Sequence, residues 1–309
     1  MKYMDNWKAY LSGLCMSVIF GLTFLFTKKA LVAISPMVLL AYRFCIAAVV
    51  LTMLIVFKVI KVNYKNKPIK GLITLSVFYP VISFVFETQG IKYVSISHAG
   101  IMMSLMPIFV MILGMIILKE IPTGIQKLFI CTSITGVIFT IVFAKSTGES
   151  SEFIGTILLL ICIVSGSVNN VLSRKYSKIF TPVEITYAML IISSIFFTLT
   201  ALIQGMISGD MYNMIAAPIK ETDVLISILY LGIFASVIAF FAMNYMLAHL
   251  QAVNVSVFNN LATLVSILSG IIIADEKLYW YQIVGGILII SSVIGINYLD
   301  IVKNKSTSN

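Results

Sequence analysis

Charged residues are scarce in this sequence compared with an ordinary soluble domain. Asp, Glu, Lys and Arg make up 11% of the 309 residues, while 60% are hydrophobic. A soluble domain carries about 25% charged residues. A soluble fold of this composition lacks the polar side chains needed to cover its surface. The composition therefore excludes a soluble protein and predicts an integral membrane protein.

Cysteine is also rare, and its placement removes two kinds of chemistry. The four cysteines all lie inside apolar runs and lack the spacing of metal ligands. They predict small buried side chains, without disulfides or a zinc site. The 7 prolines and 18 glycines are too scattered for a linker or a low-complexity segment. We therefore expect no extra soluble domain and no cofactor.

Long hydrophobic runs take the place of charge. A membrane-spanning helix needs about 20 mostly apolar residues, because its backbone groups must be hydrogen-bonded within the segment. Ten runs meet this rule, at 9–28, 36–57, 71–91, 97–118, 125–144, 153–173, 183–205, 224–247, 252–273 and 280–300. A cleaved signal peptide is the alternative for the first run. That run lacks a small-x-small cleavage site, and Lys28 and Lys29 directly follow it, so we expect a helix.

Lysine and arginine are divided unequally between the two predicted sides of the membrane. With a cytoplasmic amino terminus, 14 basic residues fall on the cytoplasmic side and six on the other, and Arg43 lies inside the second span. Such an excess marks the cytoplasmic side. We therefore expect a multi-pass protein of the cell membrane with both termini in the cytoplasm. The same bias accounts for the net charge of +9, so no nucleic-acid partner is needed.

A short polar stretch between two apolar runs, here called the polar corner, occurs twice. The stretch LKEIPTGIQ (118–126) matches ADEKLYWYQ (274–282), with Glu120 on Glu276 and Gln126 on Gln282, 156 residues later. Nearer the amino terminus, an offset of 146 places residues 29–36 on 175–182. Each half, 1–145 and 146–309, therefore holds five spans. Because five is odd, the halves must cross the membrane in opposite directions.

The predicted fold class is thus all-α integral membrane, with ten transmembrane helices in two inverted five-helix repeats. Many secondary transporters have this architecture, with the substrate site near the midplane between the repeats. We expect Glu120 and Glu276 to have a structural role, each at the positive end of the helix that follows it. A role in binding substrate or protons is the alternative.

The segment RFCIAAVVL in the second span and the stretch 232–295 resemble the drug/metabolite transporter superfamily, EamA type. The acid, glutamine and glycine of that family correspond to Glu276, Gln282 and Gly286. One departure is Thr263, where the family usually has a proline, although Pro107 keeps it in the first half. The resemblance implies that spans five and ten are peripheral and that the other eight surround a cavity.

The resemblance also implies a membrane transporter that exports small polar metabolites such as amino acids by alternating access. Its partners would be a small-molecule substrate and the lipid bilayer, and proton coupling and facilitated diffusion both stay open. A multidrug or cation exporter is the alternative, but the first span lacks the acid on which small four-span exporters depend. An intramembrane enzyme is disfavoured, because the two histidines, His98 and His249, lie on opposite predicted sides.

Ionisable residues inside spans are costly and mark candidate functional sites. Arg43 lies at a depth of about 10 Å in the second span, and Glu87 lies at about 6 Å in the third, measured from the same side. The two residues could form a structural ion pair or bind the substrate directly. His98 is expected at the outer mouth of the fourth span, in the interface.

Uncharged polar residues matched by the repeat supply further candidates. The repeat pairs Thr23 with Asn169, Thr88 with Asn244, and Ser104 with Asn260. We expect the asparagines to line the cytoplasmic half of the cavity and their partners to line the outer half. Contacts between helices are the alternative.

The third span carries a polar stripe, because Tyr79, Ser83 and Glu87 recur at four-residue intervals and so share one helix face. The predicted substrate-binding residues are Thr23, Arg43, Tyr79, Ser83, Glu87, Thr88, Ser104, Asn169, Asn244 and Asn260.

Overall fold

A computed structural model describes residues 6–117, 123–146, 150–176, 179–249 and 252–307. The elements of the first half are α1 (Asn6–Ala30), α2 (Pro36–Val56), α3 (Lys70–Ser76), η1 (Val77–Ile82), α4 (Ser83–Tyr93), α5 (Ile96–Met103), α6 (Met106–Ile117) and α7 (Gly124–Ser146). Those of the second half are α8 (Ser150–Tyr176), α9 (Pro182–Ser208), η2 (Tyr212–Ala216), η3 (Ala217–Lys220), α10 (Thr222–Leu229), η4 (Tyr230–Ile238), α11 (Ala239–His249), α12 (Ala252–Leu268), η5 (Ser269–Ile273) and α13 (Trp280–Thr307).

The predicted all-α membrane fold is confirmed. Within the described ranges, eight helical segments are long and apolar enough to cross a membrane, and two shorter apolar helices, Phe258–Ile273 and Trp280–Ile296, complete the ten. Each coincides with a predicted span, and the ends differ by a few residues. Spans three, four, eight and nine are each built from two or three consecutive elements.

The two repeats begin their second spans in the same way. Pro36 and Pro182 each occupy the start of a helix, where the absence of a backbone N–H costs nothing. Thr181 and Glu184 also form a reciprocal cap at the start of α9. This correspondence is the one expected from the offset of 146 residues.

The repeated glutamines of the polar corner cap the fifth and tenth spans. The Oε1 atom of Gln126 accepts from the backbone N–H of Thr123 at 2.8 Å, and that of Gln282 accepts from Tyr279 at 3.0 Å. In both cases the glutamine lies three residues beyond its partner, as in a capping box. The corner repeats because both repeats start a helix there.

The repeated glutamate of that corner has the expected structural role, but Glu276 does not cap the helix that follows it, so the expected helix is wrong. Its carboxylate accepts from the backbone N–H groups of Ile96 at 2.7 Å and Ser97 at 3.1 Å. These groups lie at the start of α5, in the other repeat. Lys28 at the end of α1 also donates to Glu276, at 3.1 Å. The favourable positive helix end is therefore that of α5. Glu120 lies outside the described residues.

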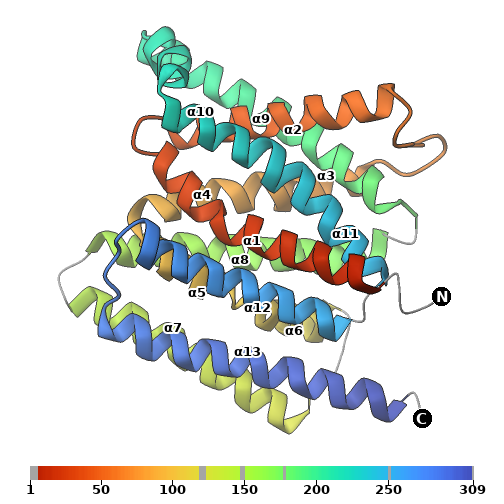
Figure 1. Ribbon diagram of the computed structural model, residues 1–309, viewed down its shortest axis with the longest axis vertical. Helices are drawn as coiled ribbons and strands as arrows, with labels where there is room; N and C mark the ends of the chain where they lie inside the picture. The colour runs from red at the N-terminus through yellow and green to blue at the C-terminus, as the bar shows by residue number, and fades with distance from the viewer. Residues whose placement is uncertain (1–5, 118–122, 147–149, 177–178, 250–251, 308–309) are drawn as a thin grey trace.

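Figure 1 shows α2, α9 and α10 at one edge of the bundle and α7 and α13 at the opposite edge. These last two helices, spans five and ten, pack directly on each other. A Cβ atom at Gly285 of α13 would lie 2.9 Å from the carbonyl oxygen of Gly136 in α7, so the contact requires glycine. The peripheral position expected for these two spans agrees with this packing.

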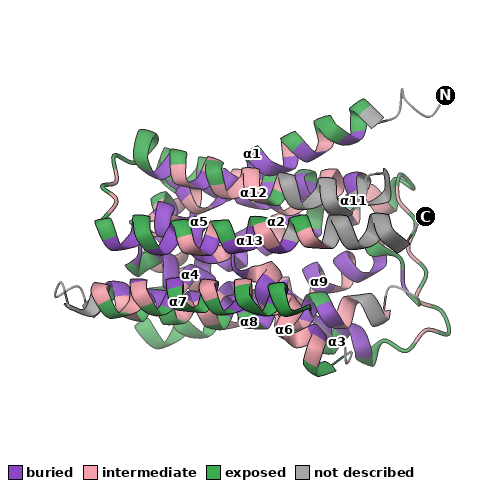
Figure 2. Ribbon diagram, turned by 90° about the horizontal axis from the view of Figure 1, so that it is seen from below, coloured by how far each residue is buried: buried purple, intermediate pink, exposed green. Residues whose placement is uncertain are grey.

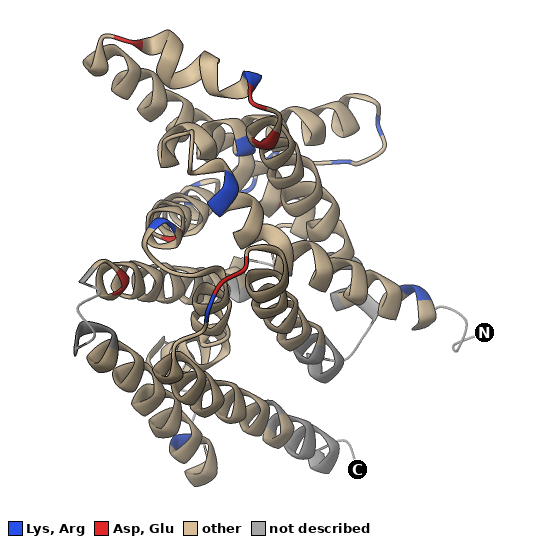
Figure 3. Ribbon diagram, turned by 60° about the vertical axis from the view of Figure 1, so that its left-hand side comes forward, with Lys and Arg blue, Asp and Glu red and all other residues tan. Residues whose placement is uncertain are grey.

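The surface of the bundle suits a hydrocarbon environment. Exposed residues cover the outward faces of the helices in Figure 2, and many are large and apolar, such as Leu199, Ile272 and Ile287. Charged residues lie mostly in loops and near helix ends in Figure 3, which leaves long uncharged stretches between them. Such extensive apolar exposure is expected of a chain surrounded by lipid.

The loop after α2 is fastened to the start of α9 at one end of the bundle. Lys67 forms an ion pair with Glu184 at 2.6 Å, and Glu184 also accepts from the backbone N–H of Asn63 at 2.9 Å. Tyr64 donates to the backbone oxygen of Glu184 at 2.7 Å. Burial and the nearby Glu184 carboxylate raise the pKa of the Tyr64 phenol, so it remains a donor at neutral pH. This end is the one predicted to face the cytoplasm.

Candidate substrate-binding site

The third span is interrupted in its interior, between α3 and α4. Tyr79 has extended backbone angles (φ −147°, ψ 121°), and Pro80 follows it. The break removes regular helical hydrogen bonds, and Ser165 of α8 donates to the carbonyl oxygen of Phe78 at 2.6 Å in compensation. Shifted by 156 residues, η1 falls on 233–238, inside η4 of the eighth span. Both repeats therefore depart from α-helical geometry at the same place.

Arg43 of α2 lies beside this break. Its side chain is buried, and Nε donates to Ser236 Oγ of η4 at 3.1 Å. The guanidinium carbon lies 4.4 Å from the centre of the Phe84 ring, a cation–π contact. The two terminal nitrogens have no hydrogen-bond partner among the described residues. Arg43 therefore joins the two repeats and keeps its planar pair of donors available.

Glu87 of α4 is the second buried charged group here. Its Oε2 atom accepts a weak hydrogen bond from Cys162 Sγ at 3.9 Å, and it interacts electrostatically with Arg43 and Tyr79. Ser83 lies one turn before it and donates to the carbonyl oxygen of Cys162 at 3.1 Å. The structure therefore brings Arg43, Tyr79, Ser83 and Glu87 together around one break.

The direct ion pair that we considered for Arg43 and Glu87 is not formed. Among the described residues, the two ion pairs are Lys28–Glu276 and Lys67–Glu184. The guanidinium and the carboxyl group thus lie in one buried region without a direct contact between them. Buried charges normally require close partners. A zwitterionic ligand could supply a partner for each charge at once.

Two of the three residues predicted to line the outer half of the cavity use their hydroxyl groups in local hydrogen bonds to the backbone. Thr23 donates to the carbonyl oxygen of Ile19 at 3.1 Å, and Ser104 donates to that of Ile101 at 2.6 Å. Both bonds stay within the local helix and do not extend to Arg43. Thr88 is buried, with an exposed fraction of 1%, and follows Glu87 directly.

The predicted asparagines have different surroundings. Asn169 is buried in α8, and its amide oxygen has no hydrogen-bond partner within the part of the chain that the structure describes. Asn260 is half-buried in α12. The side chain of Asn244 lies outside the described residues. An unsatisfied buried amide oxygen is uncommon and costly, which makes Asn169 a good candidate for contact with a ligand or water.

The second repeat has Thr263 where the first repeat has Pro107, and this explains a difference between the two repeats. In the first half the fourth span is interrupted between α5 and α6, just before Pro107. In the second half α12 continues without interruption through Thr263 to Leu268. The absence of proline at Thr263 is consistent with the regular helix of α12 around that position.

Our expectation that His98 lies in the interface is wrong. Its exposed fraction is 1%, and Nε2 lies 3.0 Å from the hydroxyl of Thr156. The Thr156 hydroxyl donates to the carbonyl oxygen of Glu152 at 2.8 Å, which leaves it to accept from His98. His98 therefore packs between α5 and α8.

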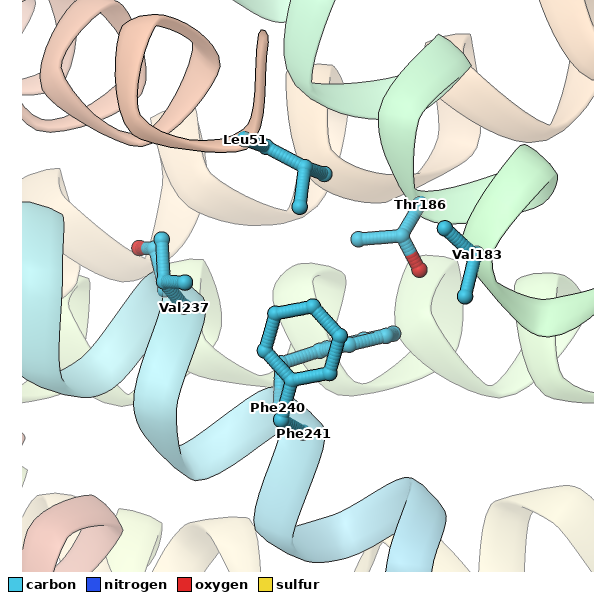
Figure 4. A pocket seen from close by; sticks show the side chains of 7 residues that line it. Leu51, Val183, Thr186, Val237, Phe240 and Phe241 are labelled. Atoms are coloured by element: carbon cyan, nitrogen blue, oxygen red, sulfur yellow. The ribbon is translucent and has the colours of Figure 1, made fainter. Parts of the chain in front are cut away.

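Sequence reasoning missed Ser236 and Cys162, the contacts of Arg43 and Glu87. Ser236 also lines a crevice between α2, α9 and the eighth span, where Phe240 and Phe241 project toward Leu51 and Thr186 (Figure 4). Its volume is about 10 Å³, room for roughly one water molecule. A larger ligand therefore needs movement of the helices to reach Arg43 by this route.

Ten apolar spans in two inverted repeats, with charged groups at an interrupted helix between them, define a membrane transporter. The chain belongs to the EamA-like transporter family, whose model matches residues 7–142 and 153–298. It thus lies in the drug/metabolite transporter superfamily, as the sequence resemblance indicated.

Several proteins resemble this chain over nearly its whole length. The "Uncharacterized transporter YcxC" of Bacillus subtilis is 35% identical over 94% of this chain and 92% of its own. An "Uncharacterized transporter" of Archaeoglobus fulgidus is 26% identical over 91% of this chain and 95% of its own. A solved structure titled "Crystal structure of protein" aligns with a TM-score of 0.62 at 16% identity, covering 94% of this chain and 96% of that one. This last likeness shows the fold alone.

Proposed function

We propose that the protein exports small zwitterionic metabolites, of which amino acids are the simplest, by alternating access between its two repeats. The observation that carries the proposal is the buried Arg43 and Glu87, which face one region without a direct ion pair. A carboxylate would pair with the terminal nitrogens of Arg43, and an ammonium group would pair with Glu87. The interrupted third span supports this position, because transporter sites form at such breaks.

The same arrangement disfavours a site for lipophilic cations. Glu87 alone would attract a cation, but Arg43 repels it at short range. A zwitterion avoids this conflict because it presents both signs of charge. Asn169, Asn244 and Asn260 would add donors and acceptors without the cost of another buried charge.

The proposal is tested with purified protein in proteoliposomes that are loaded with radiolabelled amino acids. We expect efflux above that of empty liposomes, measured with and without a pH gradient. Arg43→Gln and Glu87→Gln should each lower it at least about tenfold. Lys61→Gln changes an exposed charge in the loop after α2 and should leave transport unchanged. Transport of a lipophilic dye cation without transport of any amino acid would refute the proposal.

A further inference from the structure

A polar cavity lies at the end of the bundle that is predicted to face outside. Its volume is about 230 Å³, well above the roughly 10–15 Å³ that one water molecule requires. It is built from the end of α1, the loop between α4 and α5, the start of α8 and the loop before α13. The lining residues are Lys28, Lys92, Tyr93, Val94, Ser95, Glu152, Glu276, Lys277, Tyr279 and Gln282.

The two carboxylates of this cavity are already engaged by protein donors. Glu276 accepts from Lys28 and from the backbone N–H groups at the start of α5. Glu152 is buried and accepts from the Tyr281 hydroxyl at 2.6 Å and from the Gln282 amide. Both carboxylates thus have their oxygens engaged within the protein, and neither forms an ion pair with Lys92 or Lys277.

The three lysines are less completely satisfied. Lys28 divides its ammonium group between Glu276 and the carbonyl oxygen of Val94, at 2.7 Å. Lys92 and Lys277 are exposed, and neither has an ion-pair or hydrogen-bond partner in the part of the chain that the structure describes. The charged groups of this cavity that have no ion-pair partner among the described residues are thus cationic.

We propose that this cavity is an anion-binding site that takes a small carboxylate or phosphate group between Lys92 and Lys277. It is separate from the Arg43 cluster, which consists of Arg43, Tyr79, Ser83 and Glu87. Ammonium groups that line one cavity repel each other, and a bound anion relieves that repulsion. No residue of this cavity belongs to the Arg43 cluster. The site would concentrate small anions at the outer end of the bundle. The phosphate of a lipid headgroup has the same chemistry as a free phosphate.

The test measures binding by equilibrium dialysis, with radiolabelled succinate and inorganic phosphate. The full-length protein is held in nanodiscs of phosphatidylcholine. We expect saturable binding that weakens at least about tenfold in the Lys92→Gln/Lys277→Gln variant, because charge-assisted hydrogen bonds are lost. Lys92→Arg/Lys277→Arg should retain binding. Lys220→Gln, which changes an exposed lysine beside Tyr212, should behave as the parent.

Two further arms separate the alternatives. Arg43→Gln should keep the binding, since the central site is not involved, even if transport fails altogether. Added phosphatidylglycerol that competes with the soluble anions would support the site and identify a lipid headgroup as an occupant. An absence of competition would support the site with soluble anions as its ligands. Absent saturable binding, or binding lost in Arg43→Gln but retained in Lys92→Gln/Lys277→Gln, would overturn the proposal.

Discussion

Arg43 shows how much a single residue can indicate in a chain with so few charges. Removing a guanidinium from water costs several kcal/mol unless its donors are engaged, and Arg43 engages one of them, through Ser236. The Phe84 ring offsets part of that cost. Glu87 is in a similar position, with a weak thiol donor. Both residues thus keep hydrogen-bonding capacity that no residue in the described ranges uses.

The first prediction separates a binding role of these two residues from a structural one. Arg43→Gln, Glu87→Gln and the double variant should each accumulate near the parental level, because neither charge depends on a direct bond to the other. Transport should fall at least about tenfold in all three, as expected when a charge-assisted hydrogen bond to the substrate is lost. Membrane abundance and proteoliposome efflux are measured together. Depleted single variants with transport restored in the double variant would instead indicate a structural pair.

A second prediction concerns the repeat-matched asparagines. Leu has a similar size to Asn but neither its donor nor its acceptor. Asn169→Leu, Asn244→Leu and Asn260→Leu should therefore insert normally and lose transport or change substrate preference. Asn259→Leu is the matched control, since Asn259 is the exposed neighbour of Asn260. Unchanged kinetics in all three variants would show that these side chains only hold helices together.

At the scale of elements, the start of α5 depends on a residue from the other repeat. The first N–H groups of a helix have no partner within it, and Glu276 accepts from two of them while it also binds Lys28 of α1. One carboxylate thereby fastens α1 and α5 to the loop that precedes α13. An opening between the repeats at this end would have to break those bonds.

The third prediction follows from this arrangement. Glu276→Ala should lower the thermal unfolding midpoint in detergent by several degrees, because each buried donor left without a partner costs about 1–3 kcal/mol. Glu276→Gln should have an intermediate effect, because its amide oxygen can replace part of the interaction. Asp275→Asn is the control, since the neighbouring residue has a positive φ that Asn also tolerates. Equal midpoints for Glu276→Ala and Asp275→Asn would contradict the role of Glu276.

The sequence predicted local features of the elements and missed those that depend on distant contacts. The ten spans follow from run length, and the cap by Gln282 follows from its three-residue separation from Tyr279. The cap on α5 joins residues 180 positions apart, so no local pattern indicates it. Ser236 and Cys162 were missed because a single serine or cysteine in an apolar span has many equivalent explanations. The position of Arg43 was predicted, but its partner was not.

At the scale of the whole molecule, the duplication explains both the symmetry and its limits. The paired starts at Pro36 and Pro182 and the matched irregularities at η1 and η4 preserve the repeat. The uninterrupted α12 departs from it, since Thr263 stands where the first repeat has Pro107. The charged cluster departs further, because Arg43 and Glu87 both come from the first half. The two halves therefore share a scaffold but contribute different chemistry to the proposed site.

The last prediction tests how that scaffold sits in the membrane. The excess of basic residues places the loop that contains Lys65 in the cytoplasm and the segment around Asp210 outside. Lys65 and Asp210 are both exposed, so a cysteine at either position can react once the reagent reaches it. In intact cells, an impermeant thiol reagent should label Asp210→Cys and leave Lys65→Cys unlabelled.

Permeabilised cells should show labelling of both, and the parent protein, with its four native cysteines, gives the background. Because the order of spans fixes the two segments on opposite sides, labelling of Lys65→Cys alone from outside would reverse the orientation. Labelling of both from outside would contradict the count of spans between them.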